Sequence, residues 1–422
     1  MKLHSGFLGL ILCFTAAATA IGEPAEPRSW ESLLTQPSLL DGPASLKESL
    51  REHGLNFDAS WTQFYQGVVL GEAQHNWRYG GKIDLIGNVD LTRFGLWPGF
   101  SLAVHQEFNY GKDVNNAGTG LIIPANTSMA LPRLGGGNAN TSISLTQRFN
   151  ERISLTAGKI NMLQALEAVP LAGGGGNATF VNTGLAAPIN GVTPPYLLGA
   201  MLSARTDPAI VGLWVYDPRN AQGRDVIEHP FGDGVTTSLS VTLPTQIAGL
   251  SGFYGVRGVY STQEGFDFRD LPALALPSDS AAALSTKNKY WFSSVSFQQY
   301  LMQNHDNPAE GWGIFGQAGI SDGNPNPFKW SVVAGLAGTS PLPSRNLDRW
   351  GIGYFYYGLS SELKEGLAAL GQGVRNEYGI EAFYNHAFTP WFRLTADAQW
   401  VRPGTVGFSD AIVLGLRAQT RF

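Results

Sequence analysis

The chain is poor in cysteine, in charge and in long apolar runs, and each shortage excludes a class of protein. Cys13 is the one cysteine among 422 residues. It falls in a segment that we expect to be cleaved, so the mature protein lacks disulfides and thiolate metal sites. Charged residues make up 14% of the chain, against roughly 25% in soluble proteins. The formal charge is −5 and no basic block occurs, which excludes a nucleic-acid partner. No stretch past residue 22 approaches the roughly 18 apolar residues of a membrane-spanning helix.

Glycine and aromatic residues are abundant instead. The chain has 52 glycines and 11% aromatic residues, and its mean hydropathy is close to neutral at −0.06. A disordered chain has few aromatics and high net charge, so this composition excludes disorder. The near-neutral hydropathy also argues against a bundle of apolar helices.

The first twenty residues have the features of a secretory signal peptide. Lys2 precedes the short apolar run Phe7–Phe14, and small residues ending in Ala18-Thr19-Ala20 follow. Such a segment is removed on export. We expect an N-terminal periplasmic segment over residues 21–54, with a short helix near its end, and a β-barrel over 55–422.

Period-two alternation begins at Leu55 and recurs to the end of the chain. In Lys82–Thr92, Ile83 and Leu85 share one face, whereas Lys82 and Asp84 share the other. Segments of about ten residues with this pattern, separated by turns, are typical of transmembrane barrels. We count about sixteen of them, and a barrel of that size encloses a lumen wide enough for water and solute.

The connections between these segments alternate in length. Short turn-rich junctions occur at 95–99, 150–151, 206–208 and 388–390, while long connections cover 111–140, 160–197, 217–234 and 262–289. Outer-membrane barrels have short periplasmic turns and long extracellular loops. The sequence therefore predicts an all-β, antiparallel transmembrane barrel of about 16 strands with long extracellular loops. We expect the connection 160–197 to fold inward and narrow the pore.

The final segment is strongly amphipathic. Ile412, Leu414 and Leu416 alternate with polar positions, and the segment stops at Phe422. An aromatic residue at the end of an amphipathic strand fits the assembly signal of outer-membrane proteins. We assign Phe422 to membrane assembly and place the protein in the bacterial outer membrane.

Several segments resemble the carbohydrate-selective outer-membrane porins, the OprB family. The strongest is Gly379–Phe422, and Arg345–Asp348 with Gly351–Tyr354 is similar to the preceding block. Gly95–Gly99 resembles the early turn of the family. The resemblance covers about residues 40–422. It implies a monomeric or trimeric porin of sixteen strands that passes mono- or oligosaccharides down a gradient.

Charged residues on the polar faces are the candidates for the solute pathway. Both signs are present, so their fields partly cancel, and together they offer donors and acceptors to a neutral hydroxylated solute. Interior ion pairs that brace the wall are the alternative interpretation for each of them. The candidates are Lys82, Asp84, Glu107, Lys159, Arg345, Glu377, Glu381, Arg393, Asp397 and Arg417.

Three functions other than a sugar porin are alternatives. A general porin without sugar preference is the first, a barrel-embedded hydrolase the second and a surface adhesin the third. No two histidines have metal-ligand spacing, and no Gly-x-Ser-x-Gly elbow occurs, so we expect no enzyme, no metal and no cofactor. Expected partners are the transported sugars, outer-membrane lipid and lipopolysaccharide, the barrel-assembly machinery and, if the barrel is a trimer, copies of itself.

Overall fold

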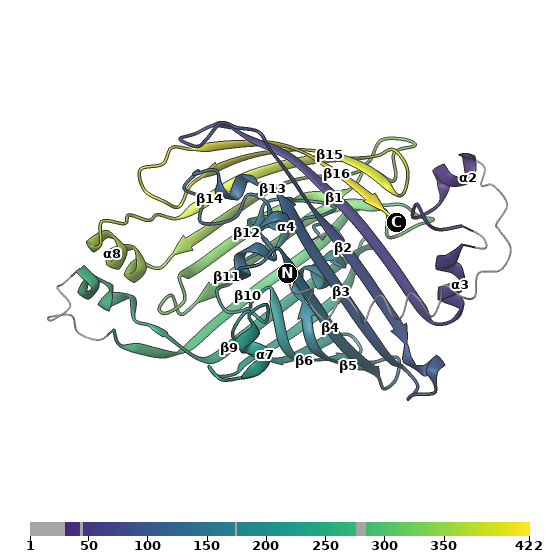
Figure 1. Ribbon diagram of the computed structural model, residues 1–422, viewed down its shortest axis with the longest axis horizontal. Helices are drawn as coiled ribbons and strands as arrows, with labels where there is room; N and C mark the ends of the chain where they lie inside the picture. Colours follow the sequence, from purple (N-terminus) through teal and green to yellow (C-terminus); the bar gives the residue numbers. More distant parts are fainter. Residues whose placement is uncertain (1–29, 43–44, 174, 276–283) are drawn as a thin grey trace, which may run out of the picture.

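The computed structural model describes residues 30–42, 45–173, 175–275 and 284–422. Its dominant feature is one closed antiparallel barrel in which every strand pairs with its sequence neighbours and β1 pairs with β16 (Figure 1). The sixteen-stranded barrel predicted from the alternation is thereby confirmed. The predicted signal peptide, residues 1–20, lies outside the described residues. The strands are β1 Leu55–Leu70, β2 Arg78–Asp90, β3 Phe100–Gly111, β4 Ala139–Arg148, β5 Ile153–Asn161, β6 Tyr196–Arg205, β7 Ile210–Tyr216, β8 Thr236–Ile247, β9 Leu250–Phe266, β10 Thr286–Gln303, β11 Gly311–Ser321, β12 Phe328–Thr339, β13 Arg349–Leu359, β14 Glu377–Ala387, β15 Phe392–Arg402 and β16 Ala411–Arg421.

Short helices occupy the N-terminal segment and the connections. Across the described ranges, no helix has both the length and the apolar character needed to cross a membrane. The α-helices are α2 Trp30–Thr35, α3 Leu46–Glu52, α4 Thr127–Ala130, α5 Met162–Glu167, α6 Thr183–Ala186, α7 Arg224–Glu228 and α8 Ser361–Ala369, and the 3₁₀ turns are η2 Leu91–Phe94, η3 Val114–Asn116, η4 Arg133–Gly135 and η5 Phe268–Ala275.

Alternation along each strand separates an apolar outer face from the interior. On β16, Leu414 and Leu416 are 36% and 45% exposed, whereas Val413 and Arg417 are 0% and 1% exposed. The same outward apolar series continues around the barrel, and so large an apolar surface is unfavourable in water. It matches the lipid-facing band of a transmembrane barrel.

Aromatic rings form a continuous row of neighbouring pairs on the outside of β12 to β15. The rings of Trp330 and Tyr356 lie 4.5 Å apart, those of Tyr356 and Tyr378 5.6 Å apart, and those of Tyr378 and Trp400 5.8 Å apart. All four residues lie near the same end of their strands, where the longer connections emerge. A girdle of amphipathic rings at one level is expected where a barrel meets the membrane–water interface.

The two ends of the barrel differ as the connection lengths predicted. Turns of two to nine residues join the strands at one end, at 91–99, 149–152, 206–209, 248–249, 304–310, 340–348 and 388–391, and the long connections are all at the other end. Helices α2 and α3 lie at the turn end beside the last strand, and α8 lies at the loop end (Figure 1).

The N-terminal segment packs against the turn end of the barrel. Ser45 caps the N-terminus of helix α3, where its hydroxyl accepts from the Glu48 amide, and Gly54, with a positive φ of 80°, follows the C-cap His53. Lys47 is buried; its ammonium lies 3.0 Å from Asp58 Oδ1 and donates to the carbonyl of Phe422 at 3.0 Å. These contacts tie α3 to both β1 and the end of the chain.

Candidate functional site

Two long connections enter the barrel and bury their middle parts there. We call residues 112–138 the first inward segment and residues 162–195 the second inward segment. Phe180 and Leu185 of the second segment join a buried apolar cluster with wall residues such as Phe355 and Phe383. The two segments are also joined to each other, because the Thr127 amide donates to the Val181 carbonyl at 2.9 Å. The interior is therefore partly filled by protein.

Two glutamates of β14 hold these segments by their backbone. Glu377 accepts from the amides of Ile122 and Ile123 at 2.7 and 2.9 Å. Glu381 accepts from the amides of Val181 and Asn182 at 2.5 and 2.9 Å. Both glutamates are at most 1% exposed. A carboxylate that accepts two backbone N–H groups makes strong charge-assisted hydrogen bonds, so each glutamate fixes one inward segment to the wall.

Neighbouring strands add further anchors. Arg417, on β16, donates to the Gly176 carbonyl of the second inward segment at 2.8 Å. Gln399, on β15, donates to the Ala125 carbonyl of the first inward segment at 3.0 Å and to Asp397 at 2.9 Å. Arg417 and Asp397 are both buried. Side chains that the alternation predicted to face the lumen thus face it, and there they meet the inward segments.

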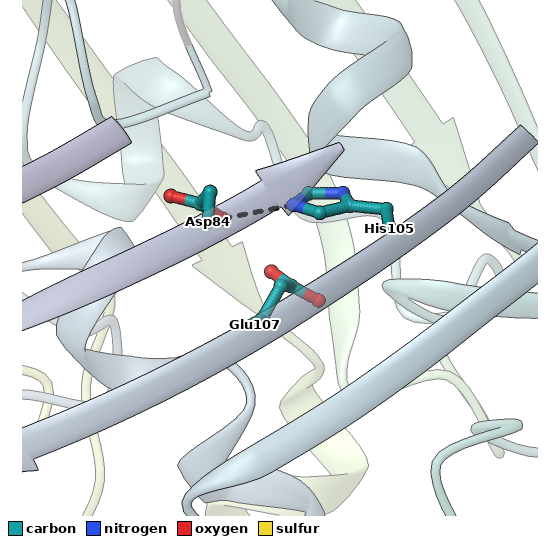
Figure 2. Close-up of side chains that lie close together, drawn as sticks. All are labelled: Asp84, His105 and Glu107. Atoms are coloured by element: carbon teal, nitrogen blue, oxygen red, sulfur yellow. Dashed lines mark hydrogen bonds and ion pairs between the residues drawn. The ribbon is translucent and has the colours of Figure 1, made fainter. Parts of the chain in front are cut away.

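Lys82, Asp84, His105 and Glu107 form a buried ionic cluster on β2 and β3. The Lys82 ammonium lies 2.6 Å from Glu107 Oε1 and 3.3 Å from Asp84 Oδ1, and His105 Nε2 lies 2.9 Å from the same Asp84 oxygen. Asp84, His105 and Glu107 point toward one another (Figure 2), with ligand atoms within 4.8 Å. Such a set of oxygens and an imidazole resembles a metal site, but Lys82 already supplies the compensating positive charge. We interpret the cluster as a brace between two strands.

The remaining three candidates lie apart from these groups, and the placement of Arg345 on a polar strand face was wrong, because it lies in a connection outside the sheet. Arg345 belongs to the turn 340–348, where it pairs with Asp348 at 2.9 Å and contacts His386. Arg393 donates to the carbonyl of Leu347 at 3.0 Å. Lys159 is half-buried on β5. The ten candidates therefore form several separate groups rather than a single site.

Two adjoining cavities lie between the second inward segment and the wall formed by β7 to β12. Their volumes are about 390 Å³ and about 450 Å³. They adjoin because Leu166 and Pro188 of the segment and Thr242, Ser296 and Gln317 of the wall line both. Each of the two has room for a small solute.

Neutral polar side chains stand among apolar ones in the walls of these cavities. Ser240 and Thr242 on β8, Ser294 and Ser296 on β10, and Gln317 on β11 contribute hydroxyl and amide groups. Each has donors and acceptors without net charge. Phe253 and Phe315 add aromatic rings to the smaller cavity. Hydroxyls and amides beside aromatic surface are the groups that a sugar can use.

A cation and an aromatic ring stand together in the larger cavity. The guanidinium carbon of Arg257 lies 4.7 Å from the centre of the Trp214 ring, a distance at which a cation–π interaction is favourable. Arg257 Nε also donates to the Ser238 hydroxyl at 2.8 Å, and Nη2 to the Thr193 hydroxyl at 3.1 Å.

None of the ten predicted residues is among the described residues that line the two cavities. Their contact with solute stays a prediction. Sequence reasoning did not select Ser240 or Thr242 on β8 as site residues. It also passed over Trp214 and Arg257. A signal was present, since Gly212, Trp214 and Tyr216 alternate with apolar residues.

Comparison with known proteins gives a consistent result. A family model described as "Carbohydrate-selective porin, OprB family" matches residues 74–422. The high-pH structure of Pseudomonas putida OprB is similar with a TM-score of 0.76 and 16% identity, over 89% of this chain and 96% of that chain. The outer-membrane channel DcaP of Acinetobacter baumannii is similar with a TM-score of 0.52 and 9% identity, over 87% of this chain and 97% of that chain. At such identities the structural likeness concerns the fold alone. A search of curated protein sequences finds no match.

Proposed function

The chain belongs to the carbohydrate-selective porin (OprB) family, and from this premise we propose that sugars cross the outer membrane through the two cavities beside β7 to β12. Family and fold point to a channel rather than an enzyme. The observation that carries the proposed route is the composition of its lining, with serine, threonine and glutamine side chains from β8, β10 and β11. When a sugar hydroxyl exchanges a hydrogen bond to water for one to such a group, the free energy changes little, since the net contribution of a neutral hydrogen bond is only about 0.5–1.5 kcal/mol.

Weak binding suits this function. Transport by diffusion requires that the solute enter readily and also leave readily. A lining of neutral hydroxyls supplies several exchangeable hydrogen bonds, none of which is strong by itself. The buried carboxylates that hold the inward segments are occupied by backbone amides, and we propose that they determine the shape of the passage rather than bind the sugar.

Blocking the cavities tests this route. Ser296 lines both cavities from the inner face of β10, so Ser296→Trp should obstruct the passage. We expect sugar-driven swelling of proteoliposomes to slow severalfold while the barrel still assembles. Val295, the next residue, is 58% exposed on the outer face, so Val295→Trp is the matched control and should swell at the wild-type rate. Wild-type swelling by a folded Ser296→Trp barrel would place the route elsewhere.

Two parts of the barrel surface are candidates for contact with partners. We propose that lipopolysaccharide contacts the outer face near the loop end, where the rings of Trp330, Tyr356, Tyr378 and Trp400 lie. We also propose that the assembly machinery recognises β16 and Phe422. The apolar outer residues Leu414 and Leu416 support this assignment, since the strand presents a regular apolar face to any partner in the membrane.

A further inference from the structure

Arg257 is the one charged side chain among the described residues that line either cavity. It projects from the inner face of β9, between the hydroxyls of Ser240 on β8 and Ser294 on β10. A single ionic group in an otherwise neutral passage has a large influence on which solutes are held there, because the protein walls reduce solvent screening.

The guanidinium is held in a defined orientation. Ser238 accepts from Nε, Thr193 of the second inward segment accepts from Nη2, and the ring of Trp214 covers one face. The Thr193 hydroxyl is itself 3.1 Å from the hydroxyl of Tyr216. Two strands and one inward segment therefore position the group, which lowers the entropy that a ligand must remove on binding.

Among the described residues, no carboxylate pairs with this cation. None of its contacts is to a carboxylate, and within the described part of the chain no Asp or Glu oxygen lies within 4.0 Å of it. Lys82, by contrast, contacts two carboxylates. A partly buried charge without a counter-charge is costly, and an anionic ligand group would remove that cost. Guanidinium also matches the planar carboxylate with two parallel hydrogen bonds.

We infer that Arg257 forms a binding site for the carboxylate of an acidic sugar, a hexuronate or an aldonate. The carboxylate contacts the guanidinium, and the sugar hydroxyls contact the hydroxyls of Ser240 and Ser294. This inference rests on the proposed route through the two cavities. It adds that the channel holds acidic sugars more tightly than neutral sugars of the same size.

The test uses the full barrel in planar lipid bilayers, with D-glucuronate and D-glucose as probes. The concentration of each sugar that halves the ionic current is measured at one low salt concentration. We expect glucuronate to act at about a tenfold lower concentration, as one charge-assisted hydrogen bond implies. Arg257→Gln should make the two sugars equal, and Arg257→Lys should retain part of the difference. Arg152→Gln, which removes an exposed arginine at the turn end, should leave the ratio unchanged.

Each outcome decides between the inference and the proposed route. If glucose reduces the current and glucuronate acts no more tightly in the wild-type channel, the acidic-sugar site is wrong while the route stands. A difference that persists undiminished in Arg257→Gln overturns the assignment to Arg257. If neither sugar reduces the current, the proposed function itself fails. If Arg257→Gln does not assemble, the wild-type channel and Arg257→Lys still decide. The site is refuted if glucose and glucuronate halve the current at the same concentration in both channels. It is supported if the wild-type channel prefers glucuronate and Arg257→Lys weakens that preference.

Discussion

Glu377 and Glu381 lie four residues apart on the inner face of β14. Each accepts hydrogen bonds from two consecutive backbone amides of a different inward segment. Glu377 holds Ile122 and Ile123, and Glu381 holds Val181 and Asn182. Residues two or four apart on a strand point to the same side, so one strand can fix both segments. The two segments that narrow the lumen are therefore held in place by side chains of the barrel wall.

Replacement of Glu381 tests this fixation. In Glu381→Gln an NH2 group, which donates but cannot accept, replaces one carboxylate oxygen, so one backbone N–H loses its buried acceptor. The loss is worth about 1–3 kcal/mol. We expect the second inward segment to detach intermittently, seen as larger fluctuations of single-channel current in a barrel that still assembles. Glu151→Gln, in an exposed turn, is the control. Current as quiet as wild type in Glu381→Gln would contradict the proposed clamp.

The outward register of β16 gives a second prediction. Leu414→Arg places a cation on the lipid face, which costs roughly 2–4 kcal/mol near the midplane. We expect a marked decrease in folded barrel in the membrane, measured by heat-modifiable migration in gels. Leu414→Ala keeps the site apolar and should assemble nearly normally. Equal assembly of the arginine and alanine variants would mean that Leu414 does not face lipid.

Deletion of Phe422 separates assembly from stability. The Phe422 amide donates to the Ala59 carbonyl at 2.8 Å, and its carbonyl accepts from Lys47, so a few contacts at the end of the barrel are lost. We expect the amount of barrel in the outer membrane to fall severalfold, while protein refolded in detergent melts within a few degrees of wild type. Phe422→Tyr should restore the amount. Normal levels after the deletion would remove Phe422 from the assembly signal.

Asp348 predicts a pH dependence at the turn end. Burial alone would raise the pKa of this carboxyl, but donation from the Tyr384 hydroxyl, the Ala387 amide and Arg345 outweighs burial and lowers the pKa below its usual value. Since the folded pKa is depressed, the stabilisation is present above the unfolded pKa of about 3.9 and is lost as the pH falls through the folded pKa.

The measurement is the heat-unfolding midpoint of Asp348→Asn and wild type in detergent. We expect the variant to be less stable near neutral pH, by about 1–3 kcal/mol for the lost charged hydrogen bonds, and the difference to shrink below pH 4. Asp306→Asn, at a residue that is almost fully exposed, should show no such dependence. A difference that is constant from pH 7 to pH 3 would contradict the role given to the ionised carboxyl.

The strands of this barrel could be predicted from the sequence because lipid and lumen impose a period of two. The faces assigned to Leu414 and Leu416, and to Lys82 and Asp84, are those of the structure. The alternation also placed Glu381 on the inner face. Connection lengths identified which end carries the turns.

The content of the lumen could not be predicted in the same way. The inward segments have no periodicity, so the sequence did not show that Glu381 meets the Val181 amide instead of water. Several of the charged residues chosen as pore candidates form hydrogen bonds with the backbone of the inward segments. Small neutral residues such as Ser240 and Ser296, which line the cavities, carry no individual signal. The separation of Arg257 from carboxylates depends on packing that only the fold determines.

The ionic current through single channels during stepwise addition of neutral sugars tests the central claim most directly. Purified mature protein is inserted in a planar bilayer, and glucose and maltose are raised in separate titrations. A carbohydrate porin whose passage runs along β7 to β12 should show a current that falls and then saturates with sugar, because an occupied cavity of about 450 Å³ leaves little room for ions. A protein that conducts but never responds to sugar at any concentration would contradict the account, and so would a folded barrel that carries no current.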